Sequence, residues 1–389
     1  MTTDSASDDV PLRTALVEHL ESVGAIRTPP WRAAFLDVPR HVFTPTVYQR
    51  TATGRALLTP GDRQWWAAVY SDDSVVTQLD PSGIATSSST QPRVMATMLE
   101  ALDVSDGQQV LEIGTGTGYN AALLCHRLGE ANVTSVDVDP VLVAQAETAL
   151  AACGYRPMLI AGDGRLGCPR RAPFQRIIAT CSVGRVPAAW LEQTTTGGVI
   201  LANIGFGTVA LRLADDGAAS GRFLRDGAAF IAARATSQFV TVAPGRIVEL
   251  CHGQGTLHRY PPVTEILLDN AEFQFVLQLA LPHLASVVIE ATESCGPIRC
   301  LFDAATGSWA RAEKKPNGFA VNHGGTMNLW DETLRVLSVW ADAGRPPREL
   351  LGLTVTHAGT HHLWVEEPDS DQKPLLALRN CENGIETES

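Results

Sequence analysis

The sequence is poor in basic residues, has no Cys-x-x-Cys pair and contains no long apolar run. Its 30 Lys and Arg are outnumbered by 42 Asp and Glu, and the formal net charge of −12 repels phosphate backbones and anionic lipid headgroups. A membrane-spanning helix needs roughly 20 consecutive apolar residues, and the start MTTDSASDDV is acidic where a signal peptide would be basic and then apolar. We therefore expect a cytoplasmic protein that has neither nucleic acid nor a membrane as its partner.

The eight cysteines have no spacing typical of a redox motif. A chain of 389 residues can build its core without disulfides, so free and mostly buried thiols are predicted. Apolar residues make up 45% of the chain and charged residues 19%, which is typical of a globular protein. Since domains usually have about 100–200 residues, this length predicts two folding units.

Short apolar strands alternate with helical patterns between residues 109 and 204. Strands are predicted at 109–113, 133–137, 157–161, 174–180 and 198–204, and helices at 119–128, 141–152 and 186–191. Strands that alternate with helices in this way form right-handed βαβ units. The pattern predicts an α/β fold with a doubly wound, Rossmann-like parallel sheet.

Composition and patterning divide the chain into four parts. We expect a disordered arm at 1–10, a first domain at 11–205, a mixed, strand-rich C-terminal domain at 206–368 and an acidic, poorly ordered tail at 369–389. Within the first domain, residues 46–90 carry few strand patterns, so they are predicted to form a long connector with a functional role.

The C-terminal domain is predicted from runs of β-branched residues between turn signals. Strands are expected at 239–242, 286–289 and 353–356, and helices at 273–281 and 333–340.

A glycine-rich turn follows the first strand of the alternating region. Residues 110–119 read VLEIGTGTGY, with glycines at 114, 116 and 118. Glycine lets the backbone turn tightly and approach a ligand closely. Counted from Gly114, the dinucleotide fingerprint needs a third Gly or Ala at position 119, where the sequence has Tyr119. The turn alone is compatible with a ligand loop of another kind and with a purely structural βα turn.

Acidic residues stand at the ends of consecutive strands around this turn. Glu112 lies two residues before Gly114, Asp137 ends the second strand and Asp163 follows the third. The carboxyl ends of parallel strands meet at one edge of a sheet, so these acids converge on one crevice. They predict S-adenosylmethionine as the cofactor, with its amino acid moiety over the glycine loop, its ribose hydroxyls on Asp137 and its adenine amino group on Asp163. The predicted cofactor contacts are Glu112, Gly114, Thr115, Gly116, Gly118, Tyr119, Asp137, Val138, Asp163 and Gly164.

Four segments together resemble the protein-L-isoaspartate O-methyltransferase family over roughly residues 12–205. They are VPRHVFTP at 38–45, VLEIGTGTGY at 110–119, AGDG at 161–164 and the glycine pair at 197–198. The resemblance implies a class I methyltransferase fold and methyl transfer from S-adenosylmethionine to a carboxylate.

The family's Ile-Ser-x-Pro substrate loop falls on residues 89–92, which read Ser-Thr-Gln-Pro, so Thr90 stands where the family has serine. The resemblance implies Ser89 and Thr90 as catalytic residues, and Ser88 and Gln91 as substrate contacts. Arg40 and His41 are expected either to contact the peptide backbone of the substrate or to shape the substrate loop by packing. A carboxylate is already ionised at pH 7, so these hydroxyls are expected to hold it by hydrogen bonds while alignment does most of the work.

A longer form of the family offers a more specific resemblance. WAAVYSDD at 66–73, followed by the Ser-Ser-Ser-x-Gln-Pro loop, is similar to relatives found with ATP-grasp peptide maturases, which make graspetides. That implies methylation of an aspartate on a ribosomally made precursor peptide, and closure of the ester to an aspartimide. The common repair enzyme ends soon after the methyltransferase domain, so the extra length favours a dedicated peptide substrate over an isoaspartyl-containing protein. A non-catalytic nucleotide-binding scaffold is the remaining alternative.

Other clusters point less clearly to chemistry. His357, His361 and His362 could suggest a metal cluster, but the surrounding pattern predicts a hairpin with its turn at 358–359, and no metal is expected. Cys181 is predicted to be a small wall residue of the crevice and not a nucleophile. The aromatics of the connector, Trp65, Trp66 and Tyr70, either form a peptide-binding face or pin the connector to the core.

Overall fold

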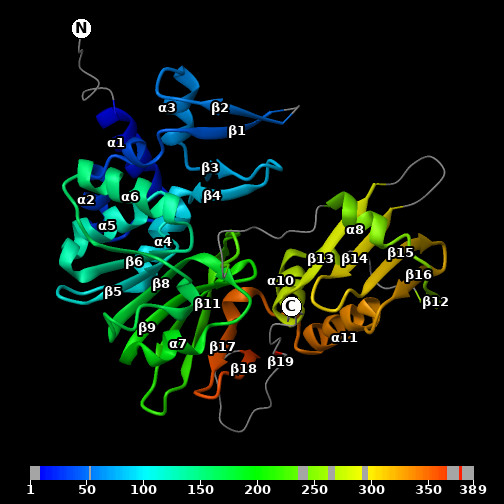
Figure 1. The fold of residues 1–389 in the computed structure, drawn as a ribbon. Coiled ribbons are helices and arrows are strands. Elements are labelled where there is room, and N and C mark those ends of the chain that lie inside the picture. Colours follow the sequence, from blue (N-terminus) through cyan, green and yellow to red (C-terminus); the bar gives the residue numbers. More distant parts are fainter. Residues whose placement is uncertain are drawn as a thin grey trace, which may run out of the picture.

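The computed structural model describes residues 9–51, 54–234, 244–261, 268–290, 297–365 and 376–378. Its strands form a ten-stranded, a four-stranded and a five-stranded sheet. Helices cover the ten-stranded sheet, the four-stranded sheet lies beside it near the N-terminal helices, and the five-stranded sheet stands apart with its own helices (Figure 1). Among the described residues, no helix is both long and apolar enough to cross a lipid bilayer.

Five parallel strands form one half of the large sheet, in the order β9-β8-β5-β6-β7. They are β5 (Val110–Ile113), β6 (Val133–Asp137), β7 (Met158–Ala161), β8 (Phe174–Val183) and β9 (Thr194–Ile204). The connecting helices are α5 (Tyr119–Leu128), α6 (Pro140–Ala152) and α7 (Ala188–Glu192), with short 3-10 helices η2 (Glu130–Asn132) and η3 (Gly164–Leu166). This arrangement confirms the predicted doubly wound sheet. The chain order reverses between β5 and β8, and ligands of such folds bind beyond the carboxyl ends of the strands at that point.

The large sheet continues in antiparallel strands beyond residue 205. These are β10 (Gly207–Leu213), β11 (Ala219–Gly227), β17 (Leu351–Val355), β18 (His361–Val365) and β19 (Leu376–Leu378). The boundary expected at residue 205 therefore falls inside a sheet, because β9 turns directly into β10. β19 lies in the segment expected to be a poorly ordered tail, yet it pairs with β18. The rest of that tail, residues 1–8 of the arm expected at 1–10 and the strand expected at 239–242 lie outside the described residues, while residues 9 and 10 of that arm begin a helix.

A second unit is built on the five-stranded antiparallel sheet, in the order β12-β16-β15-β14-β13. Its strands are β12 (Thr256–Tyr260), β13 (Leu284–Ile289), β14 (Ile298–Asp303), β15 (Trp309–Lys315) and β16 (Gly318–Gly324), and its helices are α8 (Pro244–Leu250), α10 (Ala271–Ala280) and α11 (Leu329–Asp342). Successive side chains of a strand point to opposite faces, so Cys300 packs in the small cluster under α8 while Leu301 joins the main core. The predicted strand at 286–289 and both predicted helices are confirmed. We call this segment, residues 244–342, the C-terminal unit.

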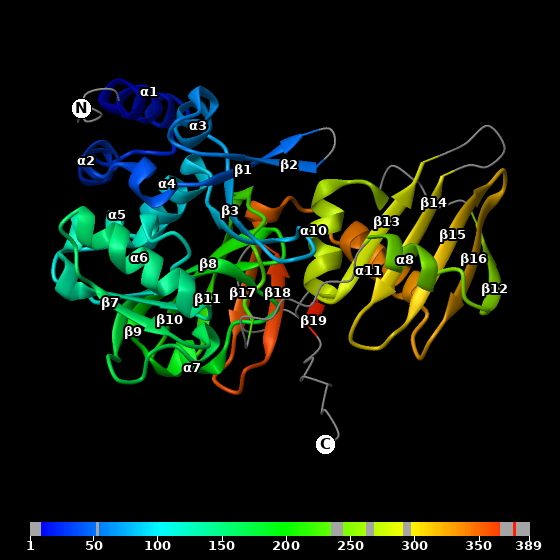
Figure 2. The same cartoon turned by 45° about the horizontal axis from the view of Figure 1, so that its top comes forward.

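The C-terminal unit packs against the antiparallel half of the large sheet through α10. Phe275 meets Phe223 of β11 edge to face, with ring centroids 4.9 Å apart. Arg348, in the 3-10 helix η4 (Arg348–Leu350), forms an ion pair with Glu272 at 3.2 Å, and its guanidinium lies 4.9 Å from the Phe275 ring centroid. One continuous hydrophobic core spans both parts. Figure 2 shows α10 and α11 between the two sheets.

The N-terminal part adds a four-stranded antiparallel sheet, in the order β2-β1-β3-β4, where the sequence predicted a connector. Its strands are β1 (Val47–Thr51), β2 (Gly54–Leu58), β3 (Val75–Leu79) and β4 (Ala85–Ser89); the helices around it are α1 (Asp9–Ser22), α2 (Pro29–Asp37), the 3-10 helix η1 (Arg40–Phe43), α3 (Arg63–Val69) and α4 (Pro92–Leu102). The prediction of few strands at 46–90 is wrong. β1 buries only Val47 fully and exposes its last three residues, so it lacks the apolar alternation by which strands are recognised.

The aromatics of this segment pin it to the core. Trp65 and Tyr70 are buried, and the Trp65 indole N–H donates to the Thr44 carbonyl at 3.0 Å. Trp66 stacks parallel to Tyr70, with ring centroids 6.3 Å apart. Of the two roles left open for these residues, anchoring is therefore the one that the contacts support.

The hairpin predicted at 354–365 is confirmed by the pairing of β17 with β18, and its histidines have structural partners. His361 is buried, its Nε2 accepts from the Val186 backbone N–H at 3.0 Å, and its Nδ1 lies 2.9 Å from the Gly359 carbonyl. These contacts fit a neutral imidazole protonated on Nδ1, and burial lowers the pKa of His361 to about 4. Among the described residues there is no group of three or more possible metal ligands. All six described cysteines are free, four of them buried, in line with the prediction.

Candidate active site

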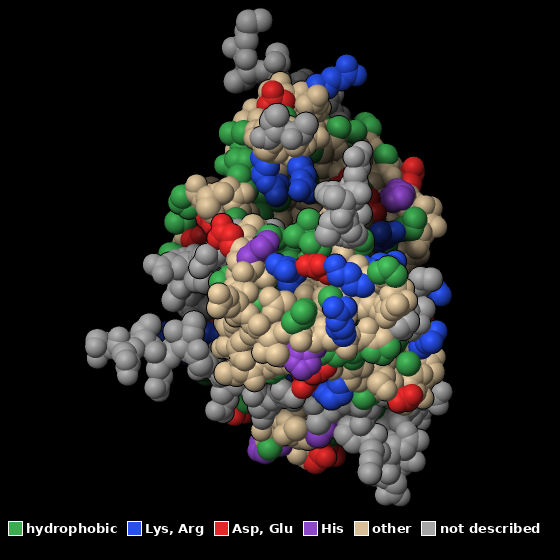
Figure 3. Space-filling model, turned by 90° about the vertical axis from the view of Figure 1, so that its right-hand side faces the viewer, with side chains coloured by type: hydrophobic (Ala, Val, Ile, Leu, Met, Phe, Trp, Pro, Cys, Tyr) green, Lys and Arg blue, Asp and Glu red, His purple; other side chains and the backbone are tan. Residues whose placement is uncertain are grey.

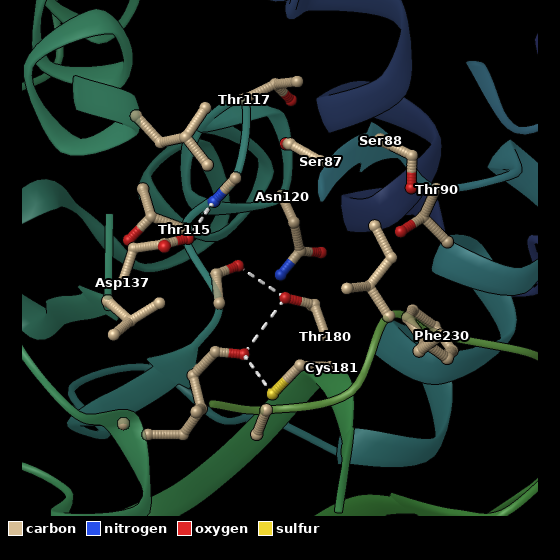
Figure 4. Close-up of a pocket in the computed structure, with 18 of the residues that line it drawn as sticks. Ser87, Ser88, Thr90, Thr115, Thr117, Asn120, Asp137, Thr180, Cys181 and Phe230 are labelled. Atoms are coloured by element: carbon tan, nitrogen blue, oxygen red, sulfur yellow. Dashed lines mark hydrogen bonds between the residues drawn. The ribbon is translucent and has the colours of Figure 1, made fainter. Parts of the chain in front are cut away.

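A cavity lies at the carboxyl ends of β5, β6 and β8, where the parallel sheet reverses its order. It encloses about 820 Å³ of space, including its open mouth. Its wall is formed by β4 and the next residue (86–90), the glycine loop (114–117), the ends of β6 and β8, and residues 230–234. In Figure 4, Asp137 lies on one side, Ser88 and Thr90 lie on the other, and Asn120 and Thr180 stand between them. The structure therefore brings the predicted cofactor and substrate elements to one place.

The glycine loop can follow its path only with glycine at critical positions. Gly114 and Gly118 have φ values of 97° and 84°, which side chains rarely adopt. A Cβ at Gly114 would lie 2.8 Å from the Thr180 hydroxyl, and one at Gly118 would lie 3.0 Å from the Ala146 Cβ. The loop therefore runs close against both β8 and α6. Its backbone is brought to the wall of the cavity, where a ligand can approach without side chains in the way.

Asp137 is the acid best placed to bind a cofactor. It ends β6, lines the cavity and is mostly buried. Its Oδ2 accepts from the Gly116 N–H at 2.8 Å, and its Oδ1 accepts from the Asp139 N–H at 3.0 Å. Burial raises the pKa of Asp137, while these two backbone donors oppose the rise. Each oxygen has a second lone pair, so the carboxylate can still accept two hydroxyl groups.

Glu112 lies beneath the glycine loop, not in the cavity. It is fully buried, and its oxygens accept from Asn120 Nδ2 at 2.7 Å and from the Ser135 hydroxyl at 2.5 Å. The Ser135 hydroxyl in turn lies 2.6 Å from that of Thr115. Burial raises the pKa of Glu112 to about 7. The predicted direct contact with the cofactor therefore gives way to a supporting role, in which Glu112 orients Asn120 and the loop.

The remaining predicted cofactor contacts divide into two groups. Gly114, Thr115, Gly116, Val138 and Gly164 line the cavity together with Asp137. Asp163 lies outside this lining, and its carboxylate pairs with Arg165 at 2.8 Å. Gly118 precedes α5, and Tyr119 is buried between Phe35 and Phe43, so both position the loop from behind. The adenine contact expected of Asp163 stays a prediction.

The hydroxyl-rich strand β4 and the residue after it, Thr90, contribute residues 86–90 to the cavity wall. Ser88 and Thr90 are partly exposed, whereas Ser89 is buried. The Ser89 hydroxyl accepts from Arg40 Nε at 3.4 Å, although Ser89 also contributes atoms to the cavity wall. Of the two residues predicted to be catalytic, Thr90 is therefore the better placed to meet a substrate.

Arg40 organises the substrate loop from below. Its guanidinium is fully buried and donates to the carbonyls of Val69, Ser71, Asp73 and Thr90 at 2.8 to 3.2 Å. Burial lowers the pKa of Arg40 to about 10, so it stays charged at neutral pH. Such a side chain cannot reach a substrate, so of the two roles left open for Arg40 the contacts support packing that positions the substrate loop.

His41 and Gln91 are likewise turned away from the cavity. His41 Nδ1 lies 2.8 Å from the Tyr70 hydroxyl, and burial lowers its pKa. The Gln91 side-chain amide donates to the Asp72 carbonyl at 2.7 Å. Neither residue lines the cavity, so the substrate contact of Gln91 stays a prediction, while the Tyr70 contact of His41 fits the packing role.

Replacing Arg40 with methionine is expected to destabilise the fold and to slow methyl transfer. Methionine fills much of the volume but leaves several buried carbonyls without donors, at about 1–3 kcal/mol for each unsatisfied group. Urea unfolding should show a loss of at least about 3 kcal/mol. The exposed Arg32 supplies the control variant, Arg32→Met. Equal unfolding midpoints for Arg40→Met and Arg32→Met would contradict the positioning role.

Two polar residues of the cavity wall, Asn120 and Arg234, were not predicted from the sequence as site residues. Asn120 is largely buried, its amide N donates to Glu112, and its Oδ1 has no hydrogen-bond partner within the described part of the chain. That oxygen is a ready acceptor for a cofactor amino group beside the glycine loop. Arg234 carries the only basic side chain among the described lining residues and donates to the Thr86 carbonyl at 3.4 Å. Asn120 directly follows the VLEIGTGTGY motif and could have been suspected, but no local pattern connects Arg234 to a motif so far away in sequence.

Comparison with known proteins identifies the family. The family model described as protein-L-isoaspartate(D-aspartate) O-methyltransferase matches residues 12–222. The chain belongs to this family. It is 35% identical over 190 residues to protein-L-isoaspartate O-methyltransferase 2 of Anaeromyxobacter sp. (strain Fw109-5), covering 49% of this chain and 68% of that one. It is also 35% identical over 182 residues to the protein-L-isoaspartate O-methyltransferase of Gloeobacter violaceus, covering 46% and 77%.

Family membership makes the chain an S-adenosylmethionine-dependent carboxyl O-methyltransferase. The cavity fits that cofactor, since it combines a glycine cradle, a buried acceptor carboxylate on Asp137 and the unpartnered Asn120 oxygen.

The extra length of this chain has a counterpart in a solved structure of the same fold. A solved structure titled protein-L-isoaspartate O-methyltransferase has a TM-score of 0.54 at 22% identity, and the match covers 91% of this chain and all of that one. A chain with this fold can thus carry further residues beyond the methyltransferase part. Length alone therefore does not separate a dedicated peptide enzyme from a repair enzyme.

Proposed function

We propose that the chain methylates the side-chain carboxylate of an aspartate in a ribosomally made, ATP-grasp-modified precursor peptide, and that the ester then closes to an aspartimide. The observation that carries the carboxylate chemistry is the row of β4 hydroxyls facing the glycine loop across one cavity. The specific substrate is supported by the departures from the repair family's pattern, which are Thr90 in the place of serine, the serine run before it and the segment at 66–73.

The residues of the cavity supply position and charge for this reaction. S-adenosylmethionine supplies an electrophilic methyl group on a positively charged sulfur. Asp137 and Asn120 would hold its polar groups, while Thr90 and Ser88 would donate hydrogen bonds to the substrate carboxylate on the opposite wall. Arg234 adds a positive charge within a protein of net charge −12, which lowers the cost of bringing an anion to the site.

The first step of the reaction requires no catalytic base, because the carboxylate that attacks the methyl group is already ionised. A carboxylate oxygen forms a bond to the methyl carbon, the carbon–sulfur bond breaks, and its electron pair stays on the sulfur. In the second step the next backbone nitrogen attacks the ester carbonyl, loses its proton and releases methanol. That ring closure can occur in solution, so the chain needs no residue for it.

Repair of isoaspartyl-containing proteins is the second candidate function, and family membership favours it. An isoaspartyl residue presents a carboxylate to the same hydroxyls, and its methyl ester closes to the same five-membered imide. A comparison of substrates separates the two functions.

The proposal predicts a strong preference for the modified precursor peptide. The enzyme would be incubated with S-adenosylmethionine and either a simple isoaspartyl peptide or the ATP-grasp-modified precursor, followed by mass spectrometry. We expect the precursor to gain one methyl group and then to lose methanol, with at least about a hundredfold higher kcat/KM than the simple peptide. Efficient methylation of the isoaspartyl peptide together with an unmodified precursor would overturn the proposal and leave repair as the function.

A further inference from the structure

We propose that Phe230 selects substrates by the residue next to the methylated one, because its ring packs against that neighbouring side chain and favours an apolar one. Phe230 belongs to residues 228–233, which follow β11 and lie outside residues 12–222, the part that matches the family model. We call residues 228–233 the wall segment. Family membership assigns it no role. The inference rests on the proposed function, since it assumes a polypeptide substrate.

Backbone hydrogen bonds at both ends hold the wall segment in place. At its start, the Ala228 N–H donates to a carbonyl of the β9–β10 turn at 3.0 Å. At its end, the Ser182 N–H of β8 donates to the Ile231 carbonyl at 3.0 Å, and the Ala233 N–H donates to the Ser182 carbonyl at 2.7 Å. Phe230 lies between these anchors, so a well-held backbone presents its ring to the cavity.

The Phe230 ring borders both the active-site cavity and the groove beside it. It lines the cavity, and it also lines an adjoining groove whose other walls include η3, the end of β8 and the β9–β10 turn. The side chain is partly exposed, and it packs against the core that contains Met95 and Ile178. The ring therefore lies where a polypeptide that inserts one side chain into the cavity continues toward the groove.

Phe230 lies on the substrate side of the cavity and away from the cofactor side. In Figure 4 it lies with Ser88 and Thr90, across from Asp137. Phe230 and Thr90 also border one small space, together with apolar side chains of α4 and β8. A carboxylate held by Thr90 thus brings the adjacent residue of the substrate to the ring. An apolar side chain gains from burial at that point, whereas a polar one gives up hydrogen bonds to water.

The outer face of the C-terminal unit is a contrasting surface. Acidic and basic side chains are interspersed on it (Figure 3), and Glu313 pairs with both Arg311 and Lys315. A surface of paired charges exerts little net attraction on a substrate. The apolar contact at the edge of the cavity is therefore the better source of selectivity.

The inference can be tested with two synthetic isoaspartyl peptides that differ only in the residues on both sides of the isoaspartyl residue, leucine in one and asparagine in the other. The two side chains are similar in size, but only leucine is apolar. Binding to protein saturated with S-adenosylhomocysteine would be measured by calorimetry. We expect the wild type to bind the leucine peptide about tenfold more tightly. Phe230→Ala should remove most of this preference, and Phe230→Leu, which keeps an apolar side chain, should retain part of it.

Phe206→Ala is the matched control, because it removes a phenyl group from the adjoining groove and leaves the cavity lining intact. It should leave the preference between the peptides unchanged. All variants should bind S-adenosylhomocysteine within a factor of about three of the wild type, and melting temperatures would verify folding.

Three results would overturn the inference: equal affinity of the wild type for both peptides, no measurable binding of the leucine peptide, or an unchanged preference in folded Phe230→Ala. If Phe230→Ala does not fold, a full preference in Phe230→Leu decides against it in the same way. The readout is binding, so it stands apart from methyl transfer. A wild type that prefers the leucine peptide but never methylates a peptide would refute the proposed function alone.

Discussion

Replacement of Asp137 by alanine is expected to raise the dissociation constant for S-adenosylmethionine by at least about a hundredfold. Two hydrogen bonds from ribose hydroxyls to a buried carboxylate contribute about 1.5–3 kcal/mol each, and about 1.4 kcal/mol corresponds to a factor of ten. The change also removes the acceptor for the Gly116 N–H, which loosens the glycine loop. Titration calorimetry with the cofactor and with S-adenosylhomocysteine would measure the loss.

Asp106 provides a control for the loss of one negative charge, because it is exposed and pairs with Arg127 far from the cavity. Asp106→Ala should bind the cofactor as the wild type does. Cofactor binding by Asp137→Ala within a factor of about three of the wild type would exclude Asp137 as the ribose acceptor.

Replacement of Thr90 by valine is expected to spare cofactor binding and to lower kcat by about tenfold to a hundredfold. Valine keeps the shape of threonine but cannot donate a hydrogen bond, and a lost hydrogen bond to a charged group costs about 1.5–3 kcal/mol. Thr90→Ser keeps the hydroxyl and restores the residue of the family loop, so it should keep most of the activity. Steady-state kinetics with a peptide substrate would separate the three proteins.

The distinction between cofactor and substrate roles depends on this comparison. If Thr90→Val instead weakened cofactor binding and left kcat unchanged, Thr90 would belong to the cofactor site. If Thr90→Ser were as slow as Thr90→Val, the hydroxyl could not be the group that matters, and the methyl group of threonine would have to shape the pocket.

The parallel sheet was predictable because its signals are local. A strand buried on both faces is a short apolar run, and Val110, Leu111 and Ile113 form one directly before the glycine loop. The Tyr119–Leu128 helix follows with the same bounds as predicted. Asp137 was placed correctly at the cavity because the ends of parallel strands share one edge of the sheet.

The remaining architecture depends on contacts between distant segments. β11 pairs with β17, so Ser220 lies opposite Thr354 across more than a hundred residues, and no local pattern announces such a pair. For the same reason, the sequence did not reveal that the ten-stranded sheet continues beyond residue 205. Arg234 reaches the cavity in the same way, through the packing of the segment after β11.

Side-chain roles were harder to predict than positions. The motif placed Arg40 and Glu112 near the site, but their burial decides that they support loops and do not touch ligands. A charged group can be buried in a folded protein only when its hydrogen bonds are satisfied. Backbone carbonyls satisfy Arg40, and the Asn120 and Ser135 side chains satisfy Glu112. Such satisfaction depends on the tertiary arrangement, which one sequence motif does not contain.

The central claim, that this cavity transfers a methyl group to a carboxylate of a peptide, is tested most directly by one labelling measurement. The protein would be incubated with S-adenosylmethionine carrying a labelled methyl group and with peptide substrates, and base-labile label on the peptide would be counted as released methanol. We expect base-labile label with the wild type and none above background with Asp137→Ala. Cofactor binding without base-labile label on any peptide, or label that resists base, would contradict it.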